Sequence, residues 1–84
     1  MPPVTVYSKP GCAPCRMTKM HLSKAGVDFT EIDLSQDTEA LDKISSMGYQ
    51  AAPVVTVGEE DSWSGFRMDK IKQITKRVTA PLSA

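Results

Sequence analysis

The chain has 84 residues, of which 40% are hydrophobic and 24% are charged, and its formal net charge at pH 7 is zero. This length indicates one domain over residues 1–84 with a small core, and the balanced charge gives no indication of a nucleic-acid partner. No apolar run approaches the ~20 residues of a membrane span, and residues 1–10 lack a signal-peptide pattern. We therefore expect a cytoplasmic monomer without a membrane partner.

The first half of the chain predicts two strands with a helix between them. Residues 4–7 alternate and are rich in β-branched side chains, which is typical of a strand. A helix is expected from residue 12 or 13 to Ala25, with Pro14 in its first turn and Gly26 as its stop. Residues 27–33 then predict a second strand.

The second half predicts a helix, a hairpin and a last helix. Ser35 or Asp37 can cap the first of these helices. The expected elements are a helix at 38–47, a strand at 54–57, a turn at 58–61, a short strand at 62–64 and a helix at 67–78. Residues 79–84 are expected to form a loose tail.

Apolar residues recur at helical spacing on one side of each helix, which predicts its buried face. Met20 falls on the far side of the first helix. The predicted buried faces are Cys15, Thr18, Leu22 and Ala25 in the first helix, Ala40, Leu41, Ile44 and Met47 in the second, and Ile71, Ile74 and Val78 in the last.

The resulting order is β-α-β-α-β-β-α, which indicates an α/β fold. The first two strands should pair in parallel through a right-handed crossover, and the last two should form an antiparallel hairpin. The expected architecture is a mixed four-stranded sheet, with the first and last helices on one face and the second helix on the other.

Charge is segregated along the chain although its sum is zero. Residues 9–24 hold four basic and no acidic residues, residues 28–42 hold six acidic and no basic residues, and residues 67–77 hold five basic residues and one acidic residue. These blocks are either ordinary solvated faces or a docking surface, since complementary charge favours the right partner. The two basic helices would share one face of the sheet.

The only two cysteines lie in "CAPC", as Cys12 and Cys15. Three interpretations are open: a structural disulfide, half of a metal site, or a redox pair. A structural disulfide this short closes a tiny loop and removes little unfolded-state entropy. Residues i and i+3 at a helix start can approach disulfide range, which favours reversible oxidation.

The two thiols are not equivalent in this pattern. Cys12 lies at the helix N-terminus, where free N–H groups and the helix dipole favour a thiolate, and Lys9 is nearby in sequence. Cys15 lies on the predicted buried stripe. Cys12 is therefore the candidate nucleophile of thiol–disulfide exchange, Cys15 the candidate resolving thiol, and Lys9 a candidate support for the thiolate.

Metal binding is the main alternative for these thiols. A closed zinc site needs four ligands, and His21 is the only histidine, which we interpret as a partly exposed structural residue. A copper(I) chaperone could use two thiolates. Such domains usually place methionine where this chain has Pro10, and their order β-α-β-β-α-β needs strands where residues 38–47 predict a helix. We therefore predict no metal site.

A strand followed by CxxC at a helix start resembles the thioredoxin superfamily. "QAAPVVTV" adds a proline just before the third strand, where that superfamily has a cis-proline. The resemblance implies a cis bond at Ala52–Pro53, whose turn would lie beside Cys12 and line the substrate groove. The alternative is an ordinary trans proline at a strand start.

"WSGFRMDK", residues 63–70, resembles the W-S-G-F-R-P motif of the NrdH-type redoxins, which are small glutaredoxin-like proteins with thioredoxin-like activity. The motif replaces the Gly-Gly-x-x-Asp-like stretch with which glutaredoxins hold glutathione. The resemblance covers about residues 4–78. It implies a thioredoxin fold, a Cys12–Cys15 redox disulfide and no bound cofactor. It also implies electrons from NADPH through the FAD enzyme thioredoxin reductase, with class Ib ribonucleotide reductase, through its large subunit, as client. A glutathione-dependent glutaredoxin is the alternative.

Two positions depart from the family pattern. Met68 stands where the motif has proline, and Ala13-Pro14 between the cysteines is neither the Gly-Pro of thioredoxins nor the Pro-Tyr of glutaredoxins. Within the motif we expect the following roles: core packing for Trp63 and Phe66, a tight turn near the redox pair for Ser64 and Gly65, and a partner contact or sheet-edge cap for Arg67.

Overall fold

A computed structural model describes residues 2–79, with the side chains of residues 78 and 79 left out. Its elements follow the predicted order: β1 (Val4–Ser8), α1 (Ala13–Lys24), β2 (Thr30–Asp33), α2 (Thr38–Ser46), β3 (Val54–Val57), β4 (Asp61–Ser64) and α3 (Met68–Thr79). Thr79, the first residue of the predicted tail, ends α3, and the rest of that tail lies outside the described residues. No helix within residues 2–79 has the length and apolar character that crossing a membrane requires.

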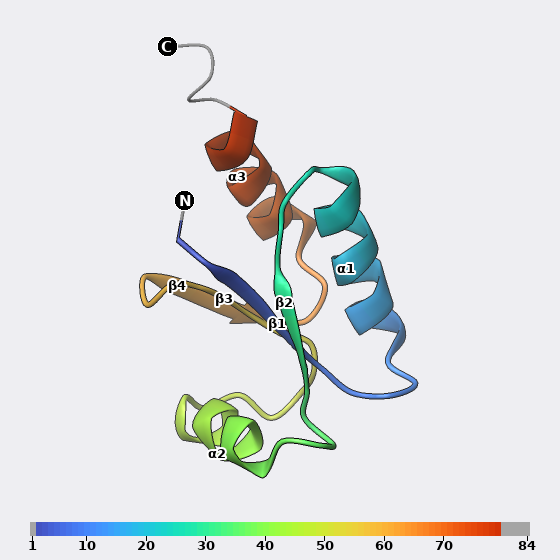
Figure 1. The fold of residues 1–84 in the computed structure, drawn as a ribbon, viewed down its shortest axis with the longest axis vertical. Helices are drawn as coiled ribbons and strands as arrows, with labels where there is room; N and C mark the ends of the chain where they lie inside the picture. The colour runs from blue at the N-terminus through green and yellow to red at the C-terminus, as the bar shows by residue number, and fades with distance from the viewer. Residues whose placement is uncertain (1, 80–84) are drawn as a thin grey trace.

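The four strands form one mixed sheet in the order β2-β1-β3-β4, as Figure 1 shows. β1 pairs with β2 in parallel, and it pairs with β3 antiparallel on its other side. β3 and β4 form the predicted hairpin, in which Val55 lies opposite Trp63. The parallel register places Ser8 opposite Asp33 at the end of both strands, close to the turn that leads into α1.

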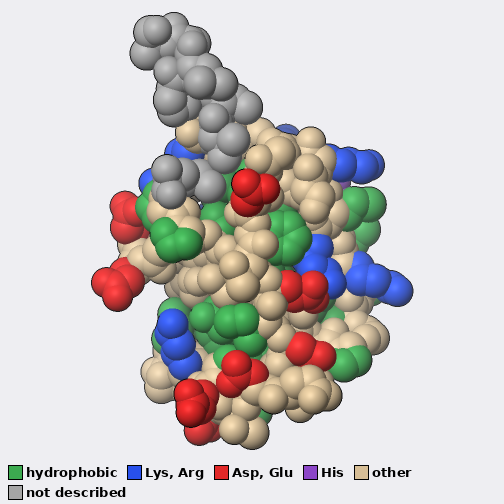
Figure 2. All heavy atoms as spheres, viewed as in Figure 1, with side chains coloured by type: hydrophobic (Ala, Val, Ile, Leu, Met, Phe, Trp, Pro, Cys, Tyr) green, Lys and Arg blue, Asp and Glu red, His purple; other side chains and the backbone are tan. Residues whose placement is uncertain are grey.

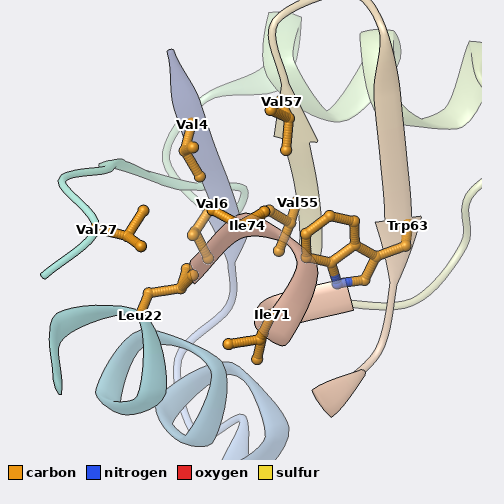
Figure 3. Packing of buried hydrophobic residues seen from close by; sticks show 9 residues of the cluster. All are labelled: Val4, Val6, Leu22, Val27, Val55, Val57, Trp63, Ile71 and Ile74. Carbon is orange, nitrogen blue, oxygen red and sulfur yellow. The ribbon is translucent and has the colours of Figure 1, made fainter. Parts of the chain in front are cut away.

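Helices cover both faces of this sheet, which confirms the predicted layers (Figure 1). α1 and α3 pack on one face, where nine buried residues from both helices, the strands and Val27 form the larger core cluster (Figure 3). α2 covers the other face through Ala40 and Ile44, which pack with Tyr7, Leu34 and Val54. The mixed sheet and its helix placement are those of the thioredoxin fold.

One helix start and one helix stop follow from local chemistry. Asp37 is the N-cap of α2, and its side chain accepts a hydrogen bond from the Ala40 N–H at 3.0 Å. After α1, the N–H of Val27 donates to the Leu22 carbonyl at 3.0 Å, so it closes the helix and does not join the sheet. For this reason β2 begins at Thr30. The predicted start at Val27 was three residues too early.

The predicted buried face of α2 was too wide. Leu41 and Met47 are 40% and 42% exposed, whereas Ala40 and Ile44 are 8% and 2% exposed. Leu41 is turned by about 100° from Ala40 around the helix axis, and Met47 is the C-cap residue beyond the last turn. A short helix contacts the sheet along one narrow row, so only the i, i+4 pair is covered.

Candidate redox site

Cys12 and Cys15 form a disulfide across the first turn of α1, with their Cα atoms 5.2 Å apart. Cys12 is the N-cap of the helix, and its Sγ accepts a hydrogen bond from the Cys15 N–H at 3.1 Å. Pro14 fits this turn because its missing N–H would have had no helical partner. The disulfide therefore fits within an intact first turn of α1.

The two sulfurs differ in exposure as predicted. Cys12 is partly exposed, whereas Cys15 is 1% exposed and lies on the buried stripe with Thr18 and Leu22. The Thr18 hydroxyl donates to the Pro14 carbonyl at 2.9 Å and holds the turn between the cysteines. A reactant from solvent can therefore contact Cys12, whereas Cys15 is covered and is accessible to the Cys12 sulfur.

A polar hollow of about 280 Å³ lies beside the disulfide. Both cysteines and Lys9 line it together with Ser8, Lys19 and Glu31. One carboxylate oxygen of Glu31 accepts hydrogen bonds from the Lys19 ammonium at 2.7 Å and from the Ser8 hydroxyl at 2.8 Å. These two hydrogen bonds hold the pKa of Glu31 below its ordinary value of 4.5, and the bond from Lys19 has the larger effect.

Ser8, Lys19 and Glu31 were not among the predicted site residues. The available signal was the parallel pairing of the first two strands, since their register places Val6 opposite Glu31 and Ser8 opposite Asp33. Both acidic residues thereby come to the sheet end at which the cysteine loop starts. Lys9, which we had predicted there, is exposed and has no ion pair among the described residues.

We expect Glu31→Gln to remove part of the acid dependence of folding stability. Because the pKa of Glu31 is lower in the folded chain, its ionised form stabilises the fold above pH 4.5, and this contribution is lost as the pH falls through the folded pKa. Urea midpoints of the wild type and the variant, compared between about pH 7 and about pH 3, should differ at neutral pH and converge in acid. The difference should be small because the Glu31 side chain is 43% exposed.

Glu39→Gln on α2 is the control for this prediction. Glu39 is also exposed, and its carboxylate accepts no side-chain hydrogen bond among residues 2–79. Its variant should change the urea midpoint at neutral pH by less than Glu31→Gln does. A Glu31→Gln difference that stays constant into acid would show that hydrogen bonding to the ionised carboxylate is not the cause.

The Ala52–Pro53 peptide bond is cis, as the resemblance implied. Pro53 is buried, and its carbonyl accepts a hydrogen bond from the Gly65 N–H at 2.8 Å. Among the described residues, the backbone N–H and C=O of Ala52 make no hydrogen bond. This stretch therefore offers free main-chain groups next to Lys9, which lies with Ala52 around a second hollow of about 170 Å³.

The "WSGFR" stretch combines core packing with a turn. Trp63 is 3% exposed and belongs to the larger core cluster, where Figure 3 shows its indole beside Val55. Phe66 packs partly buried against that cluster. Gly65 has φ +83°, a conformation that glycine adopts without strain, and its N–H ties the turn to the cis-proline.

Arg67 and His21 lie near this turn and contact neighbouring side chains. The exposed Arg67 donates to the Asp69 carboxylate from Nε at 3.0 Å and from Nη2 at 2.7 Å, so its guanidinium lies against the first turn of α3. His21 is partly buried, and its ring centroid lies 5.3 Å from that of Phe66.

Within residues 2–79, no three His, Cys, Asp or Glu side chains are grouped as metal ligands. The helix α2 also stands where the order of a copper chaperone needs strands.

Comparison with known proteins gives one family. The glutaredoxin family model matches residues 4–61. The chain is similar to the glutaredoxin-like protein NrdH of Lactococcus lactis subsp. cremoris, with 39% identity over 71 residues that cover 84% of this chain and 97% of that protein. It is also similar to the Gene 56 protein of Mycobacterium phage L5, with 34% identity over 79 residues that cover 93% of this chain and 77% of that protein.

A solved structure agrees with this result. The glutaredoxin-like protein NrdH-redoxin of Escherichia coli, which is described as having a thioredoxin-like activity profile, matches with a TM-score of 0.81 and 35% identity. The match covers 84% of this chain and 92% of that chain.

Proposed function

We propose that this chain, which belongs to the glutaredoxin family and within it to the glutaredoxin-like NrdH proteins, carries electrons from thioredoxin reductase to a class Ib ribonucleotide reductase. Its general activity is that of a thiol–disulfide oxidoreductase, which the family and the Cys12–Cys15 pair support together. One observation carries the proposal: a partly exposed sulfur at a helix N-terminus is joined to a buried one a turn away.

Cys12 is the proposed nucleophile. In the reduced protein, its thiolate would keep the Cys15 N–H as a donor and the helix N-terminus as a source of positive potential. The thiolate attacks one sulfur of the substrate disulfide, and the other substrate sulfur leaves as a thiolate that takes up a proton. The product of this step is a mixed disulfide between Cys12 and the substrate. Lys9, which lines the same hollow, is a proposed support for the thiolate.

Cys15 is the proposed resolving residue. It loses its proton and attacks Cys12 Sγ, so the second substrate sulfur leaves and the Cys12–Cys15 disulfide forms. The substrate has then gained two electrons and two protons, and the chain has lost them. Thioredoxin reductase restores the dithiol with electrons from NADPH through its FAD, so this chain itself needs no bound cofactor.

Ala52 and Pro53 are the proposed wall of the substrate groove. The free N–H and C=O of Ala52 can pair with an extended segment on either side of the substrate cysteine. Such pairing recognises main chain, so it accepts protein disulfides of varied sequence. The proposed client disulfide is on the large subunit of the ribonucleotide reductase.

The proposed reductant is thioredoxin reductase and not glutathione. Support comes from "WSGFR" at residues 63–67, where glutaredoxins have their glutathione-holding stretch, and from the thioredoxin-like activity profile of the Escherichia coli relative. The proposed compartment is the cytoplasm, because a dithiol that is re-reduced after each turnover needs a reducing environment.

The reductant is tested by an assay with two arms on the oxidised protein. One arm contains NADPH and thioredoxin reductase, and the other contains NADPH, glutathione and glutathione reductase. We expect NADPH consumption with a disulfide substrate only in the first arm, by a margin of at least about tenfold in kcat/KM. Efficient turnover in the second arm would make the protein a glutathione-dependent glutaredoxin. Turnover in the first arm would be followed by an assay with the ribonucleotide reductase.

A further inference from the structure

Residues of α1 and α3, together with Ala25, line a groove of about 410 Å³. Both helices lie on the same face of the sheet (Figure 1). The floor of the groove is apolar and consists of Ala25 from the end of α1 and of Met68 and Ile71 from the start of α3. Ile71 is 2% exposed and belongs to the larger core cluster, so the floor is continuous with the core. Met68 and Ala25 pack partly buried against the same cluster.

The groove is separate from the redox site. The lining residue of α1 nearest to the cysteines is His21, six residues after Cys15, which corresponds to roughly 9 Å along a helix axis. Neither cysteine lines the groove, and none of the groove's residues lines the hollow beside the disulfide. A segment bound in the groove would therefore leave Cys12 open to a disulfide.

Unpaired positive charge surrounds the apolar floor. Lys24, Lys72 and Lys76 line the groove, and no acidic residue does. None of these three lysines forms an ion pair among the described residues. The other cations of α3 differ in this respect, because Lys70 pairs with Asp61 and Arg77 pairs with Glu60.

Many of the acidic side chains lie away from the groove, although Asp69 is in the first turn of α3 and Glu60 and Asp61 pair with other cations of that helix. Figure 2 shows several of them around the α2 end of the visible face, and the acidic block at 28–42 includes β2 and the first turns of α2. The three groove lysines thus keep a local positive field that the zero net charge of the chain hides.

Met68 distinguishes this groove from the family pattern. The motif that the chain resembles has proline at this place, whereas here a flexible thioether side chain lies on the groove floor. Methionine adapts its shape to an apolar partner and is common at protein-binding surfaces.

We propose that the α1–α3 groove binds an acidic amphipathic segment of a partner protein. Aliphatic side chains of the segment lie on Ala25, Met68 and Ile71, and its carboxylates face the three lysines. An apolar floor inside a cationic rim fits such a segment better than a nucleic acid, whose phosphates would leave the floor uncovered. The binding does not depend on the proposed reductant or client, since the groove contains no redox residue.

The test uses the oxidised protein labelled with ¹⁵N and a synthetic helical peptide. The peptide has leucines along one face and glutamates on the others, and its control is a peptide of the same composition in scrambled order. We expect amide shifts to change around the groove and not around Cys12, with binding at least about fivefold tighter for the amphipathic peptide. Equal binding of both peptides would overturn the proposal, and so would shifts centred on Cys12 or no shifts at all.

Charge variants locate the site. The double variant Lys72→Glu with Lys76→Glu should weaken peptide binding by at least about tenfold, whereas Lys43→Glu on α2, an exposed lysine on the other sheet face, should change it by less than about twofold. Equal losses of affinity in the double variant and in Lys43→Glu would mean that binding depends on the net charge of the protein and not on the groove. Tighter binding of anionic vesicles or of a single-stranded oligonucleotide than of the peptide would assign the groove to another partner class.

Met68 is tested by Met68→Pro and Met68→Leu. Met68 is the first residue of α3, where proline is tolerated, so both variants should keep the far-ultraviolet spectrum and the thermal midpoint of the wild type. Met68→Pro should weaken peptide binding by at least about threefold, and Met68→Leu should restore most of it. Dithiothreitol-driven insulin reduction should be unchanged by the bound peptide. Loss of that reaction on peptide binding would contradict a separate docking groove.

Discussion

Replacing Cys12 by serine is expected to abolish disulfide reduction by this protein, with a loss of at least about a thousandfold in rate. Cys12 is the cysteine that solvent reaches, and its sulfur accepts a hydrogen bond from the Cys15 N–H in the first turn of α1. A serine hydroxyl does not ionise at neutral pH, so the attacking anion is lost while the turn keeps its shape. Insulin reduction with dithiothreitol and with thioredoxin reductase would both report this loss.

Replacing Cys15 by serine should stop the same reaction one step later. Cys12 still attacks, but no buried thiol follows it, so the substrate remains attached through a mixed disulfide. Mass spectrometry without reductant should show the adduct on Cys12 for the Cys15→Ser variant and no adduct for Cys12→Ser. Circular dichroism of both variants controls for folding. A Cys15→Ser protein that turned over a protein disulfide at the full rate would contradict the two-cysteine mechanism.

The redox pair was predictable because its geometry is local. Only Ala13 and Pro14 separate Cys12 from Cys15, and residues 12–22 contain the helix start, the proline and the buried stripe. The cis bond before Pro53 was predictable only from the resemblance, since the local sequence of an X–Pro bond favours trans.

The surroundings of the pair were not predictable in the same way. Ser8 and Glu31 are 23 positions apart in the sequence and meet through strand register, and Lys19 reaches them from α1. Leu41 was misplaced because helical periodicity gives the direction of a side chain but not the width of the contact that covers it. The sequence shows that Met68 differs from the proline of the family motif. Its position on the groove floor depends on how α3 packs against α1, which the sequence does not reveal.

Trp63 gives the largest expected effect on folding. Its side chain is 3% exposed within the larger core cluster, so Trp63→Ala should lower the free energy of unfolding by roughly 3–5 kcal/mol. This is a large share of the roughly 5–15 kcal/mol of a typical domain, and the core of this chain is small. Urea unfolding would measure the loss. Phe66→Ala is the control, and because Phe66 is only partly buried it should cost clearly less.

Trp63→Phe separates packing from partner contact. The indole Nε1 is buried and has no hydrogen-bond partner among the described residues, so phenylalanine removes an unsatisfied donor and keeps most of the apolar volume. The variant should lose less than about 1.5 kcal/mol and keep the wild-type KM for thioredoxin reductase. A stable Trp63→Phe protein with a strongly raised KM would mean that the indole itself contacts the reductase. A Trp63→Ala protein as stable as the wild type would show that the "WSGF" stretch is not part of the core.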